Sequence, residues 1–180
     1  GGYDPSPFHP DNILVSVGIN DEYYFTNHSE RIDKGCYHKI QSVLDKTTLL
    51  IGHNIKFDLM WLLESGFKYS GKVYDTMLGE YILNRGIRKS LTLEMSCRRR
   101  KIGSKDNRIK EYTDRGIPFQ NIPADVVEEY GRMDVKITRR LFDSQMSDLK
   151  MAKNKGLLMT AKMMNEFLIV LSDMERNGIN

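Results

Sequence analysis

The sequence predicts an α/β layer fold in which helices pack against a sheet. Three patterns support this prediction: a hairpin-like stretch near the N-terminus, a short and wholly apolar strand, and a long helix with a regular apolar face. The chain has 180 residues, of which 40% are hydrophobic and 28% are charged, so it can bury a core. No apolar run approaches the roughly 20 residues that span a bilayer, so we expect no membrane partner.

The first elements along the chain are two strands, a helix and a third strand. Ile13–Ile19 is rich in Ile and Val, and Asn20-Asp21 provides turn chemistry before a second strand at Glu22–Thr26. Asp33–Lys46 has apolar residues at helical spacing. Thr47–Gly52 is apolar in its centre and is the kind of strand that is buried on both faces of a sheet.

Helices account for most of the remaining chain. Asn54 and Asp75 are suitable N-caps, and Gly66 can end the helix that Asn54 begins. The spacing of apolar residues and the caps predict helices over residues 54–64, 75–83, 91–100, 123–149 and 157–176. A basic loop is expected after the third of these helices.

Positive charge is concentrated in residues 98–110. Seven basic residues and one acidic residue give this window a net charge of +6, within a chain whose net charge is +3. Such a stretch on a mildly acidic body fits a polyanionic partner. A solvated loop or helix face is an equally good interpretation from charge alone.

Two polar pairs have the spacing of neighbours on one helical face. Asn54 and Asp58 follow the apolar strand, and Tyr130 and Asp134 lie on the long helix. A carboxylate beside a core-facing stripe requires a partner, which can be a divalent metal ion or a basic side chain. The spacing by itself leaves both possibilities open.

The order of the segments resembles the 3′–5′ exonuclease domain of family A DNA polymerases. The second motif of that family, Asn-x-x-x-(Phe/Tyr)-Asp, is matched by Asn54, Phe57 and Asp58. Its third motif, Tyr-x-x-x-Asp, is matched by Tyr130 and Asp134. Between the two, Asp75–Leu78 reads Asp-Thr-Met-Leu, as it does in the family. The resemblance implies a ribonuclease-H-like exonuclease fold.

The resemblance also implies a division of the chain. Residues 1–149 correspond to the exonuclease domain, and residues 150–180 correspond to the start of a polymerase domain, because Leu171–Ile179 is similar to the helix that opens the thumb. Asn12–Gly18 is similar to a strand of phage-type members. The family's first motif, Asp-x-Glu, does not occur upstream of Asp58, so we expect an internal fragment that lacks the first central strand and is inactive alone.

The implied function is proofreading: hydrolysis of 3′-terminal phosphodiester bonds in DNA with two divalent ions, Mg²⁺ or Mn²⁺. The resemblance makes Asp58 and Asp134 metal ligands and Tyr130 the residue that orients the attacking water. Asn54 and Phe57 correspond to positions near the 3′-terminal nucleotide.

The implied partners are a single-stranded DNA 3′ end or primer-template and the polymerase domain of the same chain. In this context we expect the DNA backbone to be contacted by Arg98, Arg99, Arg100 and Lys101. The expected location is the cytoplasm of a bacterial or phage-infected cell. Two alternatives stay open: a ribonuclease-D-like RNA 3′ exonuclease, and a catalytically silent nucleic-acid-binding scaffold.

Overall fold

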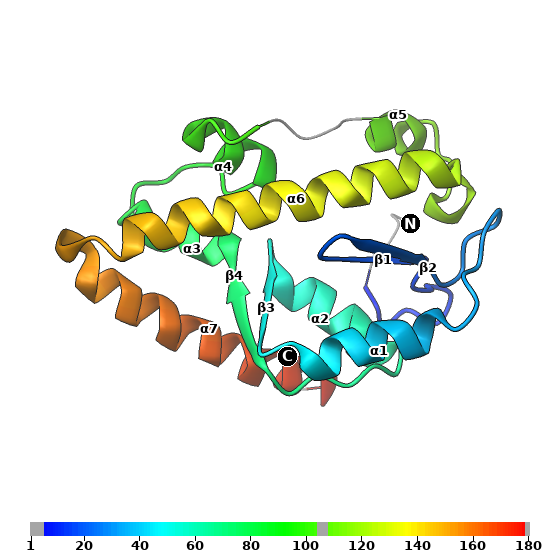
Figure 1. The fold of residues 1–180 in the computed structure, drawn as a ribbon, viewed down its shortest axis with the longest axis horizontal. Coiled ribbons are helices and arrows are strands. Elements are labelled where there is room, and N and C mark those ends of the chain that lie inside the picture. The colour runs from blue at the N-terminus through cyan, green and yellow to red at the C-terminus, as the bar shows by residue number, and fades with distance from the viewer. Residues whose placement is uncertain (1–5, 104–107, 179–180) are drawn as a thin grey trace. The chain divides into compact units, whose positions relative to one another are not determined.

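The computed structural model describes residues 6–103 and 108–178, which form two compact units (Figure 1). We call the first the hairpin unit; it holds residues 6–47, 60–69 and 108–135. The second is the parallel-strand unit, with residues 48–59, 70–103 and 136–178. Lys105 and Asp106 of the basic window lie outside the described residues.

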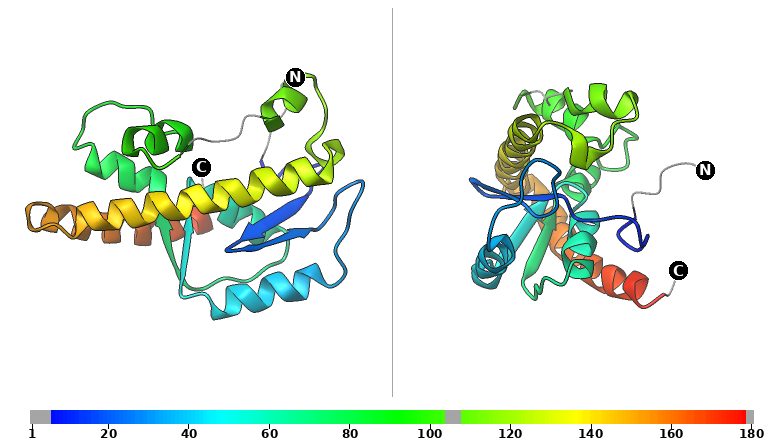
Figure 2. Two further views of the ribbon diagram at one scale, coloured as in Figure 1. Left: turned by 45° about the horizontal axis from the view of Figure 1, so that its top comes forward. Right: turned by 90° about the vertical axis from the view of Figure 1, so that its right-hand side faces the viewer.

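The hairpin unit is built on the predicted hairpin. Strands β1 (Ser16–Ile19) and β2 (Glu22–Phe25) pair antiparallel, with Gly18 opposite Tyr23. Asn20 turns the chain with a positive φ of 53°, which Asn tolerates better than most residues. Helix α1 (Cys36–Lys46) lies alongside β2 (Figure 2).

The core of the hairpin unit is partly aromatic. Tyr23 and Phe25 of β2 pack with Ile109, Ile122 and Val127. The helical elements around this core are α5 (Arg108–Asp114), the short 3-10 turn η1 (Phe119–Asn121) and the first part of α6 (Ala124–Leu149). The predicted loop after residue 100 therefore contains a helix, because burying Ile109 in this core stabilises a helical turn that its composition alone does not indicate.

The parallel-strand unit contains the second sheet. Strand β3 (Leu49–Gly52) pairs in parallel with β4 (Lys72–Asp75), and α2 (Ile55–Glu64) begins directly after β3. Three more helices belong to this part of the chain: α3 (Thr76–Leu83), α4 (Leu93–Arg100) and α7 (Lys155–Arg176). Helix α7 packs along β4 and α3 (Figure 1).

Two apolar clusters stabilise this unit. One joins Tyr74 and Ile82 to Leu149 of α6 and Ala161 of α7, and the short turn η2 (Ala152–Asn154) connects the two long helices. The other packs α4 against α6 through Cys97 and its neighbours. The caps at Asp75 and Gly66 behave as predicted, since Asp75 accepts a hydrogen bond from the backbone of α3 and Gly66 ends α2 with a φ of 89°.

One strand differs from its prediction. The apolar strand β3 was expected to be buried on both faces, but Leu49 is 39% exposed and the other residues of β3 are half-buried. Within the part of the chain that the structure describes, β4 is the only strand that pairs with β3, so one edge and part of each face stay uncovered.

Both cysteines are buried and neither forms a disulfide, with Cys36 in the hairpin unit and Cys97 in the parallel-strand unit. No helix among the described residues is long and apolar enough to cross a membrane. The mixed arrangement of small sheets and surrounding helices agrees with the α/β, ribonuclease-H-like exonuclease fold that we expected from the sequence.

Candidate active site

The first motif pair lies where β3 passes into α2. Asn54 immediately precedes the helix and adopts a left-handed conformation with a φ of 64°. Asp58 lies one turn later, and both side chains are exposed. The structure thus places an exposed amide just before α2 and an exposed carboxylate in its first turn. Phe57 is half-buried, which agrees with a packing role.

Buried polar groups hold the backbone around this pair. The Asp75 carboxylate accepts hydrogen bonds from the backbone N–H groups of Asn54 at 2.9 Å and Met77 at 2.8 Å. His53 bonds through its ring nitrogens to the Thr76 hydroxyl at 2.9 Å and to the Leu91 carbonyl at 2.8 Å. These contacts fix the end of β3 against the start of α3.

The second motif pair lies on the part of α6 that belongs to the hairpin unit. Tyr130 and Asp134 are both half-buried and four residues apart. Gly131 lies between them, and the ring of Tyr23 packs so closely that a Cβ at position 131 would come within 2.2 Å of it. Glycine is therefore required at this position of the motif, which sequence spacing did not indicate.

The pKa of the Tyr23 hydroxyl is affected by the charge of Asp134. Burial raises the pKa of its hydroxyl, a hydrogen bond with Ser16 at 2.8 Å opposes this, and the negative charges of Glu128 and Asp134 raise the pKa further. Tyr23 is thus neutral at physiological pH. The Asp134 carboxylate lies within electrostatic reach of a buried phenol.

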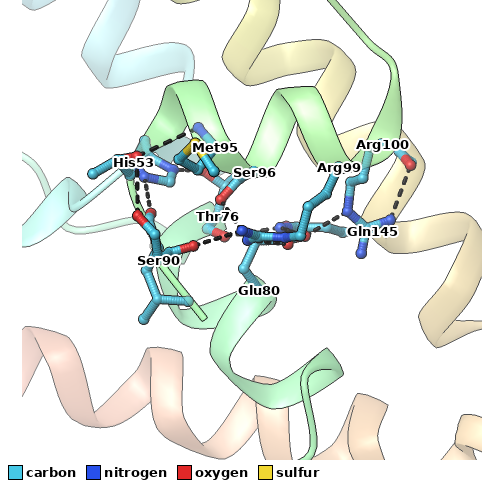
Figure 3. A network of polar contacts seen from close by, with 12 residues as sticks. His53, Thr76, Glu80, Ser90, Met95, Ser96, Arg99, Arg100 and Gln145 are labelled. Carbon is cyan, nitrogen blue, oxygen red and sulfur yellow. Dashed lines mark hydrogen bonds and ion pairs between the residues drawn. The ribbon is translucent and has the colours of Figure 1, made fainter. Parts of the chain in front are cut away.

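The four basic residues expected to contact DNA divide into two pairs. Arg98 and Lys101 are exposed on α4 and at its C-terminal cap. Arg99 and Arg100 instead form ion pairs with Glu80 of α3 (Figure 3). The structure therefore separates two exposed basic side chains from two that are engaged by a carboxylate. Contact of any of them with DNA stays a prediction.

Glu80 is the centre of this network. It is only 2% exposed, and Gln145 of α6 donates to its carboxylate at 3.1 Å and to the Thr76 carbonyl at 2.8 Å. Arg100 also reaches Asp148 at 2.7 Å. Burial would raise the pKa of Glu80, but the hydrogen bonds from Gln145 and the two arginines outweigh burial and leave that pKa below its ordinary value. Glu80 is therefore charged at neutral pH.

The carboxylates have donor chemistry suited to hard divalent cations, which prefer oxygen ligands. Across residues 6–103 and 108–178, however, no three His, Cys, Asp or Glu side chains gather in a group that could hold a metal ion. Asp58 belongs to the parallel-strand unit and Asp134 to the hairpin unit. The described residues thus supply suitable donors without forming a complete metal centre.

Sequence reasoning missed the groups that support the two motif pairs. Tyr23, which packs against the second pair, lies far from it along the chain, and the same is true of Glu80 and Gln145, which hold the neighbouring α3–α4–α6 network. The available signals were weak: Glu80 falls on the apolar side of α3, and Gln145 continues the apolar stripe of α6. A polar residue at a core-facing position indicates a buried partner, but does not identify it.

Comparison with known proteins identifies the family. Residues 8–150 match the family model of the 3′–5′ exonuclease of A-type DNA polymerases. The chain is also similar to DNA polymerase I of Borreliella burgdorferi, with 28% identity over 141 residues. That match covers 78% of this chain and 15% of the length of the relative. The chain therefore belongs to the 3′–5′ exonuclease family of A-type DNA polymerases.

Proposed function

We propose that this chain is a proofreading domain that removes 3′-terminal nucleotides from DNA within a DNA polymerase. The observation that carries the proposal is the position of Asn54 and Asp58 at the exposed start of α2, directly after β3, inside a segment that matches an exonuclease family. Such an enzyme would act in the cytoplasm of a bacterial or phage-infected cell. Its substrate would be the single-stranded 3′ end of a primer.

The proposed roles follow from the chemistry of each side chain. Asp58 and Asp134 each provide a carboxylate to a centre for Mg²⁺ or Mn²⁺. When bound, such ions supply charge stabilisation and an activated water for phosphodiester hydrolysis. The Tyr130 hydroxyl holds a water by hydrogen bonding, Asn54 contacts the terminal nucleotide through its amide, and Phe57 packs beneath it.

We also assign residues 150–180 to the beginning of the polymerase domain. Helix α7 carries an apolar stripe on its exposed side, at spacings of three and four residues: Met159, Met163, Phe167, Val170 and Met174. Exposed apolar stripes of this kind are covered by another surface in functional assemblies. Since the bacterial relative is far longer than this chain, a domain of the same polypeptide is the occupant we propose.

The function is tested with Asp58→Ala and Asp134→Ala in the full-length protein. Loss of a metal ligand removes several kcal/mol of transition-state stabilisation, so we expect excision of a single-stranded oligonucleotide to fall by about 10²-fold or more. Polymerisation should be nearly unchanged. Asp143→Ala is the matched control, because Asp143 is an exposed carboxylate on α6 that forms an ion pair with the nearby Arg139 at 3.3 Å.

Retained excision in both Asp58→Ala and Asp134→Ala would contradict the assignment of these ligands. DNA and RNA oligonucleotides of the same sequence should be compared in parallel. Faster degradation of RNA would favour an RNA exonuclease over proofreading. Binding of DNA without cleavage by the wild-type protein in Mg²⁺ or Mn²⁺ would indicate a silent scaffold.

A further inference from the structure

The backbone of Asn54 is held in a conformation that needs support. A left-handed φ costs an L-residue roughly 1–2 kcal/mol, although Asn tolerates it better than most. Asn54 is also the residue from which the chain turns out of β3 into α2. Any change in its backbone would redirect the Asn54 side chain and the first turn of α2, which carries Asp58.

The support comes from Asp75, at the end of the neighbouring strand β4. Its carboxylate is buried, at 2% exposure for the residue. One carboxylate oxygen, Oδ1, accepts both the N–H of Asn54 at 2.9 Å and the N–H of Met77 at 2.8 Å. A single atom thus fixes the entry to α2 and also caps α3.

Asp75 is in turn held by α7. Its own N–H donates to Oδ1 of Asn165 at 2.7 Å, and the Asn165 amide donates back to the Ala161 carbonyl at 2.7 Å. A second link from α7 reaches the motif directly, since Lys56 and Glu175 form an ion pair at 2.7 Å. Helix α7 therefore contacts both the motif segment and the residue that supports it.

We propose that Asp75 is a positioning residue for the exonuclease motif. By binding the Asn54 N–H, Asp75 sets the direction of the Asn54 side chain and of the first turn of α2, which carries Asp58. Asn165 of α7 keeps Asp75 in place. This inference rests on the proposed function, in which these two side chains act on the 3′ end. Asp75 itself contacts neither metal nor substrate.

The test uses three substitutions of Asp75 in the full-length protein. Asp75→Ser keeps a helix-capping hydroxyl for α3, but its side chain is one bond shorter and no longer reaches Asn54. We expect kcat/KM for excision to fall by about 10- to 10²-fold, the effect of misplacing a catalytic group by roughly 1 Å. Asp75→Ala should have at least the same effect.

Asp75→Asn retains an oxygen at the position of Oδ1 and should stay within about threefold of wild type, because an amide oxygen has two lone pairs and can accept both the Asn54 and Met77 N–H groups. Amide hydrogen exchange at Asn54 provides a readout independent of activity. The Asn54 N–H should be protected in wild type and in Asp75→Asn, and should exchange at least about tenfold faster in Asp75→Ser, as expected when a local hydrogen bond opens.

Thr92→Ala is the matched control. Thr92 caps α4 by accepting the Met95 N–H, so its loss costs a similar amount of stability, about 1 kcal/mol, without removing an acceptor of the Asn54 N–H. Equal loss of excision in Thr92→Ala and Asp75→Ser, or slow exchange at Asn54 in Asp75→Ser, would overturn the inference. A loss in Asp75→Asn as large as in Asp75→Ser would also overturn it. Retained excision in Asp58→Ala would instead show that the proposed function is wrong, and this outcome is separate from a failure of the inference about Asp75.

Discussion

The two motif pairs are supported by different kinds of contact. In the parallel-strand unit, a buried carboxylate, Asp75, holds the backbone of Asn54 by hydrogen bonding. In the hairpin unit, Tyr130 is carried by a stretch of α6 whose Gly131 packs against the ring of Tyr23. The first support is polar and specific in direction, and the second depends on close aromatic packing.

The difference predicts how each region responds to change. A buried polar network loses stability abruptly when one member is removed, because its partners become unsatisfied charges or donors. Packed apolar surfaces respond in proportion to the volume that is added or lost. Substitutions in the parallel-strand unit should therefore be more costly than substitutions of similar size in the hairpin unit.

The largest effect is expected from Glu80→Leu. It removes the carboxylate that Arg99 and Arg100 share, so that Arg100, whose side chain is 14% exposed, keeps only its ion pair with Asp148. Breaking a buried ion pair in this way costs about 3–5 kcal/mol, which chemical denaturation should detect as a lower free energy of unfolding. Glu166→Leu on the exposed side of α7 is the control. A cost below about 1 kcal/mol would show that the network contributes little.

A smaller effect is expected in the hairpin unit from Gly131→Ala. The added Cβ would lie 2.2 Å from the ring of Tyr23, so the ring or the helix must shift, at a cost of about 1–3 kcal/mol. Gly156→Ala is the control, because nothing lies within 4 Å of its added Cβ and the change should stabilise α7 by up to about 1 kcal/mol. Equal unfolding free energies for the two variants would contradict the packing argument.

Each unit contains a carboxylate whose lowered pKa makes the free energy of unfolding depend on pH in acid. The pKa of Glu80 is lowered in the fold, so its contribution is complete above the ordinary glutamate value of 4.5 and is lost as pH falls through the lowered pKa. Burial opposes the same shift at Asp33, but the Phe25 N–H and Arg31 lower its pKa overall.

Glu80→Gln and Asp33→Asn should each flatten the loss of unfolding free energy at acid pH, because each removes a carboxylate whose pKa is lowered in the fold. Denaturation midpoints measured between neutral pH and acid pH provide the comparison. A steeper acid dependence in Glu80→Gln than in wild type would refute the sign of the shift.

The smallest expected effect is on the binding of single-stranded DNA. Arg98→Ala combined with Lys101→Ala removes the exposed pair on α4, and each lost phosphate contact should reduce the log–log salt slope of single-strand binding by about 0.7. Arg99→Ala should mainly lower the free energy of unfolding and should have less effect on the salt slope, since its guanidinium is engaged by Glu80. An unchanged slope in the double variant would support the solvated-face interpretation.

Local features of this fold could be predicted from the sequence, because they depend on neighbours along the chain. The helix that follows Asn54 and carries Asp58, the cap at Asp75 and the hairpin turn at Asn20 all follow from spacing and turn chemistry. The exposure of β3 could not be predicted in this way, since it depends on which strands pair beside it.

The partners of the basic run could not be predicted for the same reason. Arg99 and Arg100 look identical to Arg98 in sequence, yet only they meet Glu80, and Gln145 completes the network from a distant helix. Helix α5 likewise forms because Ile109 is buried by residues far along the chain. Long-range burial decides these features, and local propensity does not.

The two buried thiols make the stability of each unit separately measurable. Cys36 and Cys97 are the only cysteines of the chain, and each belongs to a different unit. A thiol-specific reagent can reach a buried cysteine only when its surroundings open, so the labelling rate reports the free energy of local opening. With Cys36→Ser or Cys97→Ser, one reporter is left at a time. Kinetic labelling would then show whether the two units open together or independently.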